Sequence, residues 1–569
     1  MKKLGFLSLG IGIVCAATPA AWSNPTGGVI RNGSATIVEG IGVVSVNQAS
    51  NKAIIDWETF SIEAGELTNF NQPASGATLN RVVSANPSSI LGQLNATGDV
   101  ILINPNGIVV GPSGRVDAAS FIASTLNVSD AEFLAGGDLR FSGDSVNGVT
   151  NLGTIVAREG DLFLLGTSVN NTGSLSAPNG TVGLAAGRQI LVKATGDERV
   201  FVEVGSGGKV EHSGSIQAAV AELKAAGVDP NTLAVSVNGV VEATGVQRVG
   251  GRVYLSGGGG KVFIDAPVSA KPAPESDPIS GTRIDIKGGD IEIRGADVNA
   301  YGPGEAELLV DASGDVLIVD SLIGTMGATS GEVVIETEGD LEIRSENERS
   351  GIGQFDGPID PDVEFRIFAN SVVIEDYLSP YIFSGPDPGI IGHPDPSITS
   401  YRPVGGDIVV VGFQGGNVVL NGGDVGGGGV YQPIGSGGVV VGNGDLETHP
   451  GGSVLNSEVH RSEVSSQIVA VPSSPRISGD TLVERAPDLR LPAAFPRQIR
   501  AEVEGQASDM ATGSQNAREK DNPGTGGSDS GAVKLPSGEN RRVAGPEAFR
   551  RLFDPAGSRQ FLETRIGGE

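Results

Sequence analysis

One short phrase recurs along the chain: a glycine or another small residue, an Asp or Asn, and then apolar residues at alternating positions. Its copies read GDVILIN from residue 98, GDLRFSG from 137, GDLFLLG from 160, NGTVGLA from 179, GGKVFID from 259, GDIEIRG from 289, GDVLIVD from 314, GDLEIRS from 339, GDIVVVG from 406 and GNVVLNG from 416. Asp290, Asp315 and Asp340 are separated by the same interval of 25 residues. Such a period is typical of a solenoid, in which each repeat buries its apolar face only against its neighbours.

The repeats predict strands rather than helices. Each copy is short, rich in β-branched residues and bounded by glycines, and its apolar residues recur at every second position, as in Ile291–Arg294. Alternate side chains then point into a stacked aliphatic core while their charged neighbours point outward. Because both ends of such a stack expose unpaired strands, residues 26–45 are expected to supply antiparallel cap strands at the front end.

Some segments depart from the repeat. The alanine-rich stretch from Ile216 to Gly227 predicts a short helix that ends at its glycine. Eight prolines between residues 346 and 405 predict a long loop or irregular coil, because proline breaks strand ladders. From residue 452 the chain loses its period and is rich in Ser, Arg, Glu, Pro and Gly, which favours disorder.

The N-terminus has the features of a secretory signal peptide. It carries two lysines, an apolar stretch from Leu4 to Ala17, and small residues around Ala20 and Ser23. Cys15 is the only cysteine and lies within this stretch, so the mature chain would have no disulfide to obstruct passage through a membrane. No later apolar run approaches about 18 residues, so we expect no stable membrane insertion.

The acidic charge of the chain argues against nucleic acid as a partner. With 67 acidic against 39 basic residues the net charge is −28. Nucleic acid is excluded, because phosphate binding needs a basic footprint. Solubility through mutual repulsion explains the acidic surplus, and divalent-cation binding remains open as the other explanation.

Residues 101–129 hold the most specific local motif. Asn104-Pro105-Asn106-Gly107 has the residues of a tight turn, since Pro presets φ while Asn and Gly accept a left-handed conformation. Apolar runs precede it, from Val100 to Ile103, and follow it, from Ile108 to Val110. The pattern predicts two buried strands that meet at a sharp bend.

Together with the preceding text, this motif resembles the N-terminal secretion domain of filamentous-haemagglutinin-like exoproteins of two-partner secretion. The resemblance covers roughly residues 26–250. It is carried by dispersed blocks in the expected order: Asn47-Gln48, Lys52-Ala53-Ile54-Ile55-Asp56-Trp57 with Phe60, Asn71-Gln72-Pro73, Leu79-Asn80-Arg81-Val82, Asn104 to Ile108, and Ala123-Ser124-Thr125-Leu126. Some members carry a second tetrapeptide upstream, Asn-Pro-Asn-Leu, and this chain has Asn86-Pro87-Ser88-Ser89 there instead.

The resemblance implies a right-handed parallel β-helix with an N-terminal cap, exported by an outer-membrane transporter with periplasmic docking domains. It implies that the unfolded chain threads through the barrel and folds outside the cell. Asn104, Pro105, Asn106, Gly107 and Ile108 are then the secretion motif, either by contacting the transporter or by holding the corner. The family-match residues are expected to belong to the same domain: Asn47, Gln48, Lys52, Trp57, Asn80 and Arg81.

An enzyme is the competing class, because parallel β-helices also host polysaccharide lyases and hydrolases. Asp290, Asp315 and Asp340 would stack if their period holds in space, as carboxylates of a catalytic groove could. We favour the alternative that each occupies the same corner and bonds to its own backbone. The histidines lack the spacing of metal ligands: His212, His393, His449 and His460. We therefore predict no catalytic, cofactor or metal site.

These observations give one overall prediction, a secreted all-β exoprotein that is an adhesin or biofilm-matrix protein, with a β-helical polysaccharide-active enzyme as the alternative. Its external partner would be a host-cell or matrix glycan or protein, and retention at the cell surface stays open. The expected organisation follows the chain: a signal peptide (1–23), the secretion domain (24–260), a β-helix continuation (261–345), a Pro-rich irregular segment (346–405), Gly-rich β coils (406–451) and a largely disordered tail (452–569).

Overall fold

The computed structural model describes residues 24–355, apart from 204, 247–248, 274–280 and 348–349, and separate strands between 363 and 470. The expected signal peptide lies outside these residues, as do the prolines of the segment 346–405 and the tail after residue 470. No helix in the described part of the chain has the length and apolar character needed to cross a bilayer.

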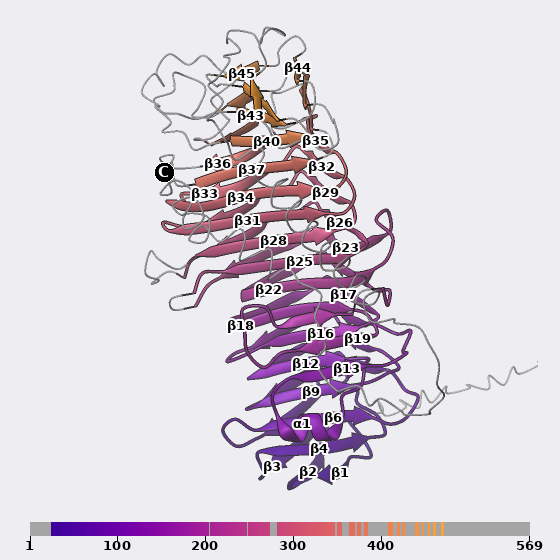
Figure 1. Cartoon of the computed structure of the whole chain (residues 1–569). Helices are drawn as coiled ribbons and strands as arrows, with labels where there is room; N and C mark the ends of the chain where they lie inside the picture. Colours follow the sequence, from indigo (N-terminus) through magenta and orange to yellow (C-terminus); the bar gives the residue numbers. More distant parts are fainter. Residues whose placement is uncertain are drawn as a thin grey trace, which may run out of the picture. The chain divides into compact units, whose positions relative to one another are not determined.

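The chain folds into successive coils whose strands stack in three ladders, most of them parallel (Figure 1). The first ladder contains β3 (Val43–Gln48), β5 (Leu67–Asn71), β8 (Gln93–Ala96), β11 (Arg115–Ala118), β15 (Thr154–Ala157), the first parts of β18 (Ser174–Ala186) and β22 (Ser215–Gly227), β24 (Val240–Thr244), β27 (Val268–Lys271), β30 (Val298–Tyr301), β33 (Leu322–Met326), β36 (Gly351–Phe355), β39 (Tyr381–Ser384), β42 (Asp424–Gly426) and β45 (Ser453–Leu455). This arrangement is the predicted parallel β-helix.

The second ladder forms the neighbouring side of the coils. It contains β4 (Lys52–Trp57), β6 (Ala77–Val82), β9 (Asp99–Ile103), β12 (Ser120–Ser124), β16 (Leu162–Gly166), the second parts of β18 and β22, β25 (Arg252–Gly258), β28 (Thr282–Gly288), β31 (Glu305–Ala312), β34 (Ser330–Thr337), β37 (Val363–Ala369), β40 (Ile408–Gly412), β43 (Val439–Gly442) and β46 (Val459–Ser462). β47 (Ile468–Ala470) pairs with β46 in the antiparallel sense.

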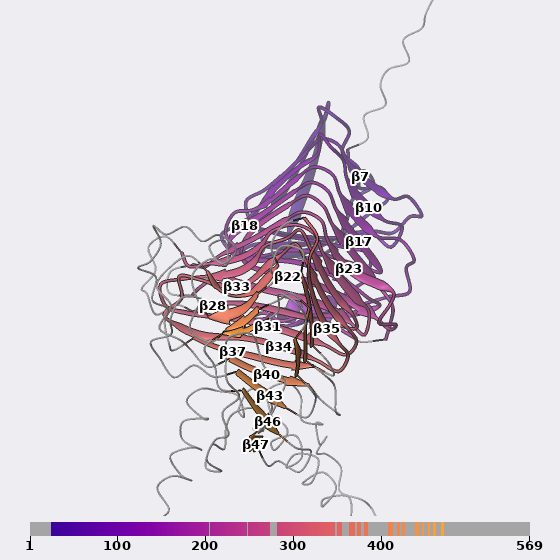
Figure 2. The same cartoon turned by 90° about the horizontal axis from the view of Figure 1, so that it is seen from above.

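The third ladder completes each coil, and Figure 2 shows several of its strands stacked along one side. It contains β7 (Ser88–Ile90), β10 (Ile108–Val110), β14 (Val149–Asn151), β17 (Ser168–Asn171), β21 (Lys209–His212), β23 (Leu233–Val237), β26 (Lys261–Ile264), β29 (Ile291–Arg294), β32 (Val316–Val319), β35 (Leu341–Ser345), β38 (Val372–Asp376), β41 (Val418–Asn421) and β44 (Leu446–Thr448). Strands β36 to β39 lie in the segment for which prolines predicted an irregular coil, and there they continue the ladders.

The core follows directly from the alternation in the sequence. In the first ladder one inward row stacks in register through five coils: Val241, Val268, Val298, Ile323 and Ile352. All five side chains are completely buried. Burying a Val or Ile side chain contributes about 1.5–3 kcal/mol, so every added coil is stabilised by the coil before it.

The front end is capped as predicted. β1 (Val29–Asn32) pairs antiparallel with β4, and β2 (Ala35–Gly40) pairs antiparallel with β3. These strands occupy the hydrogen-bonding edges that the first coil would otherwise expose, which removes a site for edge-to-edge aggregation.

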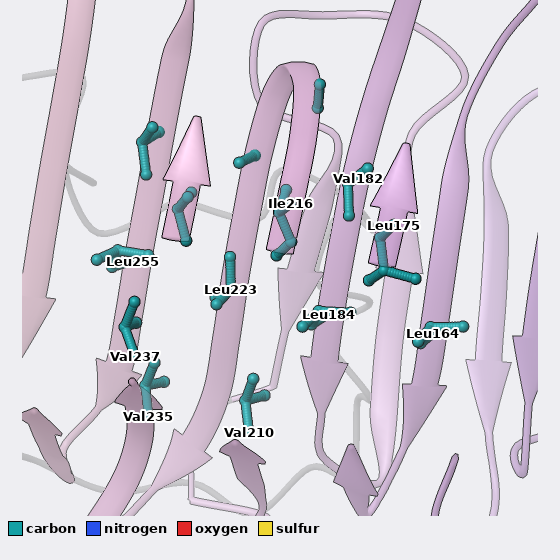
Figure 3. Packing of buried hydrophobic residues seen from close by; sticks show 14 of the residues in the cluster. Leu164, Leu175, Val182, Leu184, Val210, Ile216, Leu223, Val235, Val237 and Leu255 are labelled. Carbon is teal, nitrogen blue, oxygen red and sulfur yellow. The ribbon is translucent and has the colours of Figure 1, made fainter. Parts of the chain in front are cut away.

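The alanine-rich segment is a strand, so the prediction of a helix from Ile216 to Gly227 is wrong. β22 pairs in parallel with β18 on one side and with β24 and β25 on the other. Figure 3 shows Ile216 and Leu223 within the stacked interior, beside side chains of the neighbouring coils. Ladder hydrogen bonds and burial on both sides outweigh the local helix propensity of alanine.

The repeated aspartates do stack, but their hydrogen bonds differ from the prediction. The Asp290 carboxylate accepts from the backbone N–H of Asp315 at 3.0 Å, and Asp315 accepts from the N–H of Asp340 at 2.9 Å. Each carboxylate therefore fixes the corner of the following coil instead of bonding to its own backbone. These contacts give the 25-residue period a structural cause.

A separate layer, here called the cover, packs on the outer face of the second ladder (Figure 1). It consists of the helix α1 (Asp130–Ala135) and an antiparallel sheet of β13 (Leu139–Ser142), β19 (Gln189–Val192) and β20 (Val200–Val202). Ladder and cover share a second apolar cluster that includes Ile101, Phe163, Phe133, Phe141 and Ile190. The second ladder is therefore buried on both faces here, which the repeat pattern does not predict.

A chain of buried polar side chains runs inside the third ladder. Asn151 Nδ2 donates to Asn171 Oδ1 at 2.7 Å, and Asn171 Nδ2 lies 2.9 Å from His212 Nδ1. His212 Nε2 lies 3.2 Å from the carbonyl oxygen of Val240, which can only accept, so Nε2 carries the proton and Nδ1 accepts from Asn171. The ring is completely buried, and burial lowers the pKa of His212 below its ordinary 6.5, although both hydrogen bonds oppose the shift.

This arrangement predicts a pH-dependent stability. Because the folded-state pKa of His212 lies below the unfolded value, its contribution is fully present above pH 6.5 and is lost as the pH falls below that value. The expected loss is at most about 1.4 kcal/mol per pH unit. His212→Asn, which can continue the Asn ladder, should flatten the slope of unfolding free energy against pH between 7.5 and about 5.5. Urea unfolding of both chains at each pH measures this, and equal slopes would contradict it.

Candidate secretion site

The turn from Asn104 to Gly107 joins β9 to β10, as predicted, and is closed by a hydrogen bond from the N–H of Gly107 to the carbonyl of Asn104, 3.1 Å long. Gly107 adopts a φ of +107°, which a residue with a side chain rarely accepts. Asn104 and Asn106 are not among the described residues with positive φ, so the predicted left-handed conformation holds for the glycine alone.

The Asn104 side chain holds the turn from inside. It is completely buried, and its Nδ2 donates to the carbonyl of Asn86 and to Oγ of Ser88, both at 2.9 Å. Its Oδ1 accepts from the backbone N–H and from Nδ2 of Asn106, both at 3.0 Å. Four hydrogen bonds therefore saturate one amide group, as a buried amide requires.

The contact partners of Asn104 lie in the preceding coil, at the tetrapeptide where this chain departs from the family pattern. Ser88 supplies its hydroxyl to the Asn104 amide, and Asn106 Nδ2 adds a bond of 2.8 Å to the carbonyl of Ser84. Asn86-Pro87-Ser88-Ser89 thus still serves as the support of the Asn-Pro-Asn-Gly turn.

The outer side of the turn meets the following coil. The carbonyl of Pro105 accepts from Oγ of Ser145 at 2.5 Å and from Nδ2 of Asn147 at 3.1 Å. The Pro105 ring itself is exposed, as are Val146, at 84%, and Val83, at 61%, each next in sequence to a residue bonded to the turn. Exposed apolar side chains therefore lie beside the turn, next to exposed polar ones such as Asn86 and Asn147, while the Asn104 amide points inward.

Ile108, the last residue of the predicted motif, is completely buried at the start of β10. Its N–H donates to the carbonyl of Gly148 at 3.2 Å, which continues the ladder into the next coil. Of the five motif residues, only Pro105 is exposed, and Asn106 is half-buried.

Trp57 and Asn80 form a buried polar contact in the second ladder. Trp57 Nε1 donates to Asn80 Oδ1 at 3.0 Å, and both side chains are completely buried. Asn80 Nδ2 continues to the carbonyl of Ile101 at 3.3 Å, and the Trp57 ring packs edge-on against Phe60. This pair therefore links three consecutive coils.

Lys52 and Arg81 hold the two ends of α1. Lys52 Nζ donates to the carbonyls of Phe133 and Leu134 at 2.6 and 3.1 Å, near the negative C-terminal end of the helix. Arg81 forms an ion pair with Asp130 in the first turn. Two further bonds from Arg81 reach the residues before the helix, Asn127 Oδ1 at 2.9 Å and the Val128 carbonyl at 2.6 Å.

Asn47 and Gln48 lie at the end of β3 beside the cap. Asn47 Oδ1 accepts from Asn71 Nδ2 at 2.8 Å in the next strand of the ladder. Gln48 Nε2 donates to the carbonyl of Ala77 at 3.2 Å, and its Oε1 accepts from Thr78 at 2.5 Å. The sequence-predicted residues thus form four groups: the turn, the Trp57–Asn80 pair, the α1 supports and the cap contacts.

Glu222 and Lys224 are structural residues that the sequence analysis missed. The carboxylate of Glu222 is completely buried and accepts from the backbone N–H groups of Arg199 and Val200 at 2.6 and 2.9 Å. Lys224 Nζ lies 2.7 Å from Glu222 and 2.5 Å from Glu198. The bonds of Glu222 to the Arg199 and Val200 N–H groups, and that of Lys224 to the Val200 carbonyl, link β22 to the start of β20 in the cover. The sequence does contain an indication of this contact, because Glu222 and Lys224 are two positions apart and such a spacing places both side chains on one face of a strand.

Comparison with known proteins finds one matching family and several similar proteins. Residues 21–262 match the TPS secretion domain family. A heme/hemopexin-binding protein of Haemophilus influenzae is 39% identical over 83 residues, which cover 14% of this chain and 9% of the relative. The protein of the same name from strain ATCC 51907 / DSM 11121 / KW20 / Rd is 30% identical over 201 residues, 33% of this chain and 22% of that relative.

Two solved structures are similar. The HMW1 secretion domain from Haemophilus influenzae aligns with a TM-score of 0.40 and 20% identity, and the alignment covers 77% of this chain and 99% of that domain. The filamentous hemagglutinin secretion domain aligns with a TM-score of 0.26 and 14% identity over 57% of this chain and 98% of that domain. The chain therefore spans under a quarter of the length of both curated relatives, whereas the solved secretion domains are covered almost completely.

The N-terminal part of this chain is the secretion domain of a two-partner-secretion exoprotein. Residues 21–262 belong to the TPS secretion domain family, and they include the cap, the Asn104–Gly107 turn and the cover. Proteins with this domain are secreted to the extracellular space, so the chain is an extracellular protein.

Proposed function

We propose that an outer-membrane transporter of the two-partner-secretion class, with periplasmic docking domains, exports this chain. The observation that carries the proposal is the family match of residues 21–262. The structure suits such export, since each coil that emerges buries its apolar row on the coil before it and closes the hydrogen bonds of its edge. The free energy released by this burial and hydrogen bonding opposes return of the chain into the transporter.

Within this proposal the Asn104–Gly107 turn acts by holding a corner of the folded domain. The Asn104 amide faces inward and makes four hydrogen bonds within the chain, so it is poorly placed to contact a transporter. Exposed groups around the turn include Pro105, Val83 and Val146 as well as Asn86 and Asn147, and they would be the contact surface if the folded turn is recognised directly.

Outside the cell, the chain is proposed to act as an adhesin or matrix protein. The later coils present similar side chains in register on their outer face, with Glu307 opposite Glu332 and Asp311 opposite Glu336. A repeated surface of this kind suits many weak contacts with a host-cell or matrix glycan or protein, whose strengths combine when several engage together.

The experiment that tests export compares cells with and without the cognate transporter gene. The mature chain should reach the culture medium or the cell surface only when the transporter is present, and it should be retained in the periplasm or degraded without it. Release that does not depend on the transporter would contradict the proposal, and glycan-degradation assays would then test the enzyme alternative.

A further inference from the structure

A cavity of about 230 Å³ lies between the second ladder and the cover, at the C-terminal end of α1. Its floor carries a row of polar side chains, Asp99, Ser120 and Asp161, and Asp99 and Ser120 lie opposite each other in register at the start of β9 and β12. Its walls are apolar and come from both layers: Ile101, Ile122, Phe133, Leu139, Phe163 and Val192. The cavity thus combines an apolar interior with one polar side.

Asp99 is the carboxylate on that floor without a cationic partner. Among the described residues no Lys, Arg or His nitrogen lies within 4.0 Å of it, and its side-chain hydrogen bond is to Ser120. Burial raises the pKa of Asp99, and the nearby carboxylates of Asp161 and Glu159 raise it further. A half-buried carboxylate in this setting gains more from a bound cation than an exposed one does.

The other charged groups of the cavity already have partners. Lys52 donates to the carbonyls of Phe133 and Leu134, and Arg199 pairs with Asp161 at 2.8 Å. Lys193 Nζ lies over the ring of Phe201, 4.3 Å from its centroid. Arg199 thus balances the charge of Asp161, and a positive ligand would be drawn by the carboxylate of Asp99 itself.

We propose that this cavity binds a small organic cation, a primary amine attached to a ring or a short apolar chain. The ammonium group would bind Asp99 and Ser120, and the apolar part would lie against Ile101, Ile122 and Phe163. A cavity of about 150 Å³ holds benzene, so the volume here is suited to a ring with an aminomethyl group. The inference is independent of the export proposal, because it concerns the folded, secreted chain.

The test titrates the full secreted chain with benzylamine and, separately, with benzyl alcohol, its neutral counterpart of nearly the same shape. Binding is measured by calorimetry. Benzylamine should bind at least about tenfold more tightly than the alcohol, since a charge-assisted hydrogen bond is about twice as strong as a neutral one. Equal affinity for both, or no binding of benzylamine, would overturn the proposal.

Two variants and a control identify the site. Asp99→Asn keeps the size of the side chain and should weaken benzylamine binding at least about tenfold, while leaving benzyl alcohol unchanged. Ile122→Trp should exclude both compounds by filling the apolar part. Asp144→Asn, at an exposed carboxylate that does not line the cavity, should bind like the wild type. Thermal unfolding checks that each variant is folded, and undiminished binding by Asp99→Asn would overturn the assignment.

Discussion

Glu222→Ala should release the cover from the secretion domain. The substitution leaves Lys224 buried with only the partly exposed Glu198 as an anionic partner, and it removes the acceptor of the Arg199 and Val200 N–H groups. Removing one partner of a buried pair costs about 3–5 kcal/mol of unfolding free energy. Because Glu198 remains as an anionic partner of Lys224, we expect a loss of about 3 kcal/mol here. Hydrogen exchange at Arg199 and Val200 should consequently accelerate by about a hundredfold or more.

The matched control is Glu211→Ala, which breaks the exposed pair between Glu211 and Lys209. An exposed pair contributes about 0–1 kcal/mol, so exchange in the cover should stay nearly unchanged. The double variant Glu222→Met with Lys224→Leu should recover part of the loss, because no buried charge is left unpaired. Unchanged exchange in Glu222→Ala would show that the apolar cluster alone holds the cover.

Asn104→Ala should reduce secretion sharply. The variant loses four hydrogen bonds, and one of them leaves the buried Ser88 hydroxyl without its partner, where an unsatisfied group costs about 1–3 kcal/mol. Gly107→Val should have a similar effect for another reason. A Cβ there meets no atom closer than 3.6 Å, so the cost lies in the φ of +107° and not in a clash.

Pro105→Ala separates the two roles of the motif. The ring is exposed, and its carbonyl keeps the bonds from Ser145 and Asn147 after the substitution. If the motif holds the corner, secretion of Pro105→Ala should be close to normal; loss of secretion in this variant alone would favour direct contact with the transporter. The measurement is the ratio of extracellular to cell-associated chain, and normal secretion of Asn104→Ala and Gly107→Val would remove the motif from the mechanism.

The residues of the candidate site could be predicted from the sequence, but their partners could not. Asn104 and Gly107 were identifiable because a turn with a positive φ restricts residue type locally. Ser84, Ser88, Ser145 and Asn147 were not, because they support the turn from coils up to about forty residues away and carry no distinctive pattern of their own. Hydrogen-bond partners across coils depend on register, which the tertiary structure sets.

The sequence by itself determined the β-helix. Alternation within each repeat fixes which side chains face inward, and the interval between Asp290, Asp315 and Asp340 fixes the length of the two coils that it spans. Only the tertiary structure decided that the alanine-rich β22 is a strand and that the cover packs on the second ladder. Local propensity is worth tenths of a kcal/mol per residue, whereas pairing and burial against both neighbouring coils contribute several.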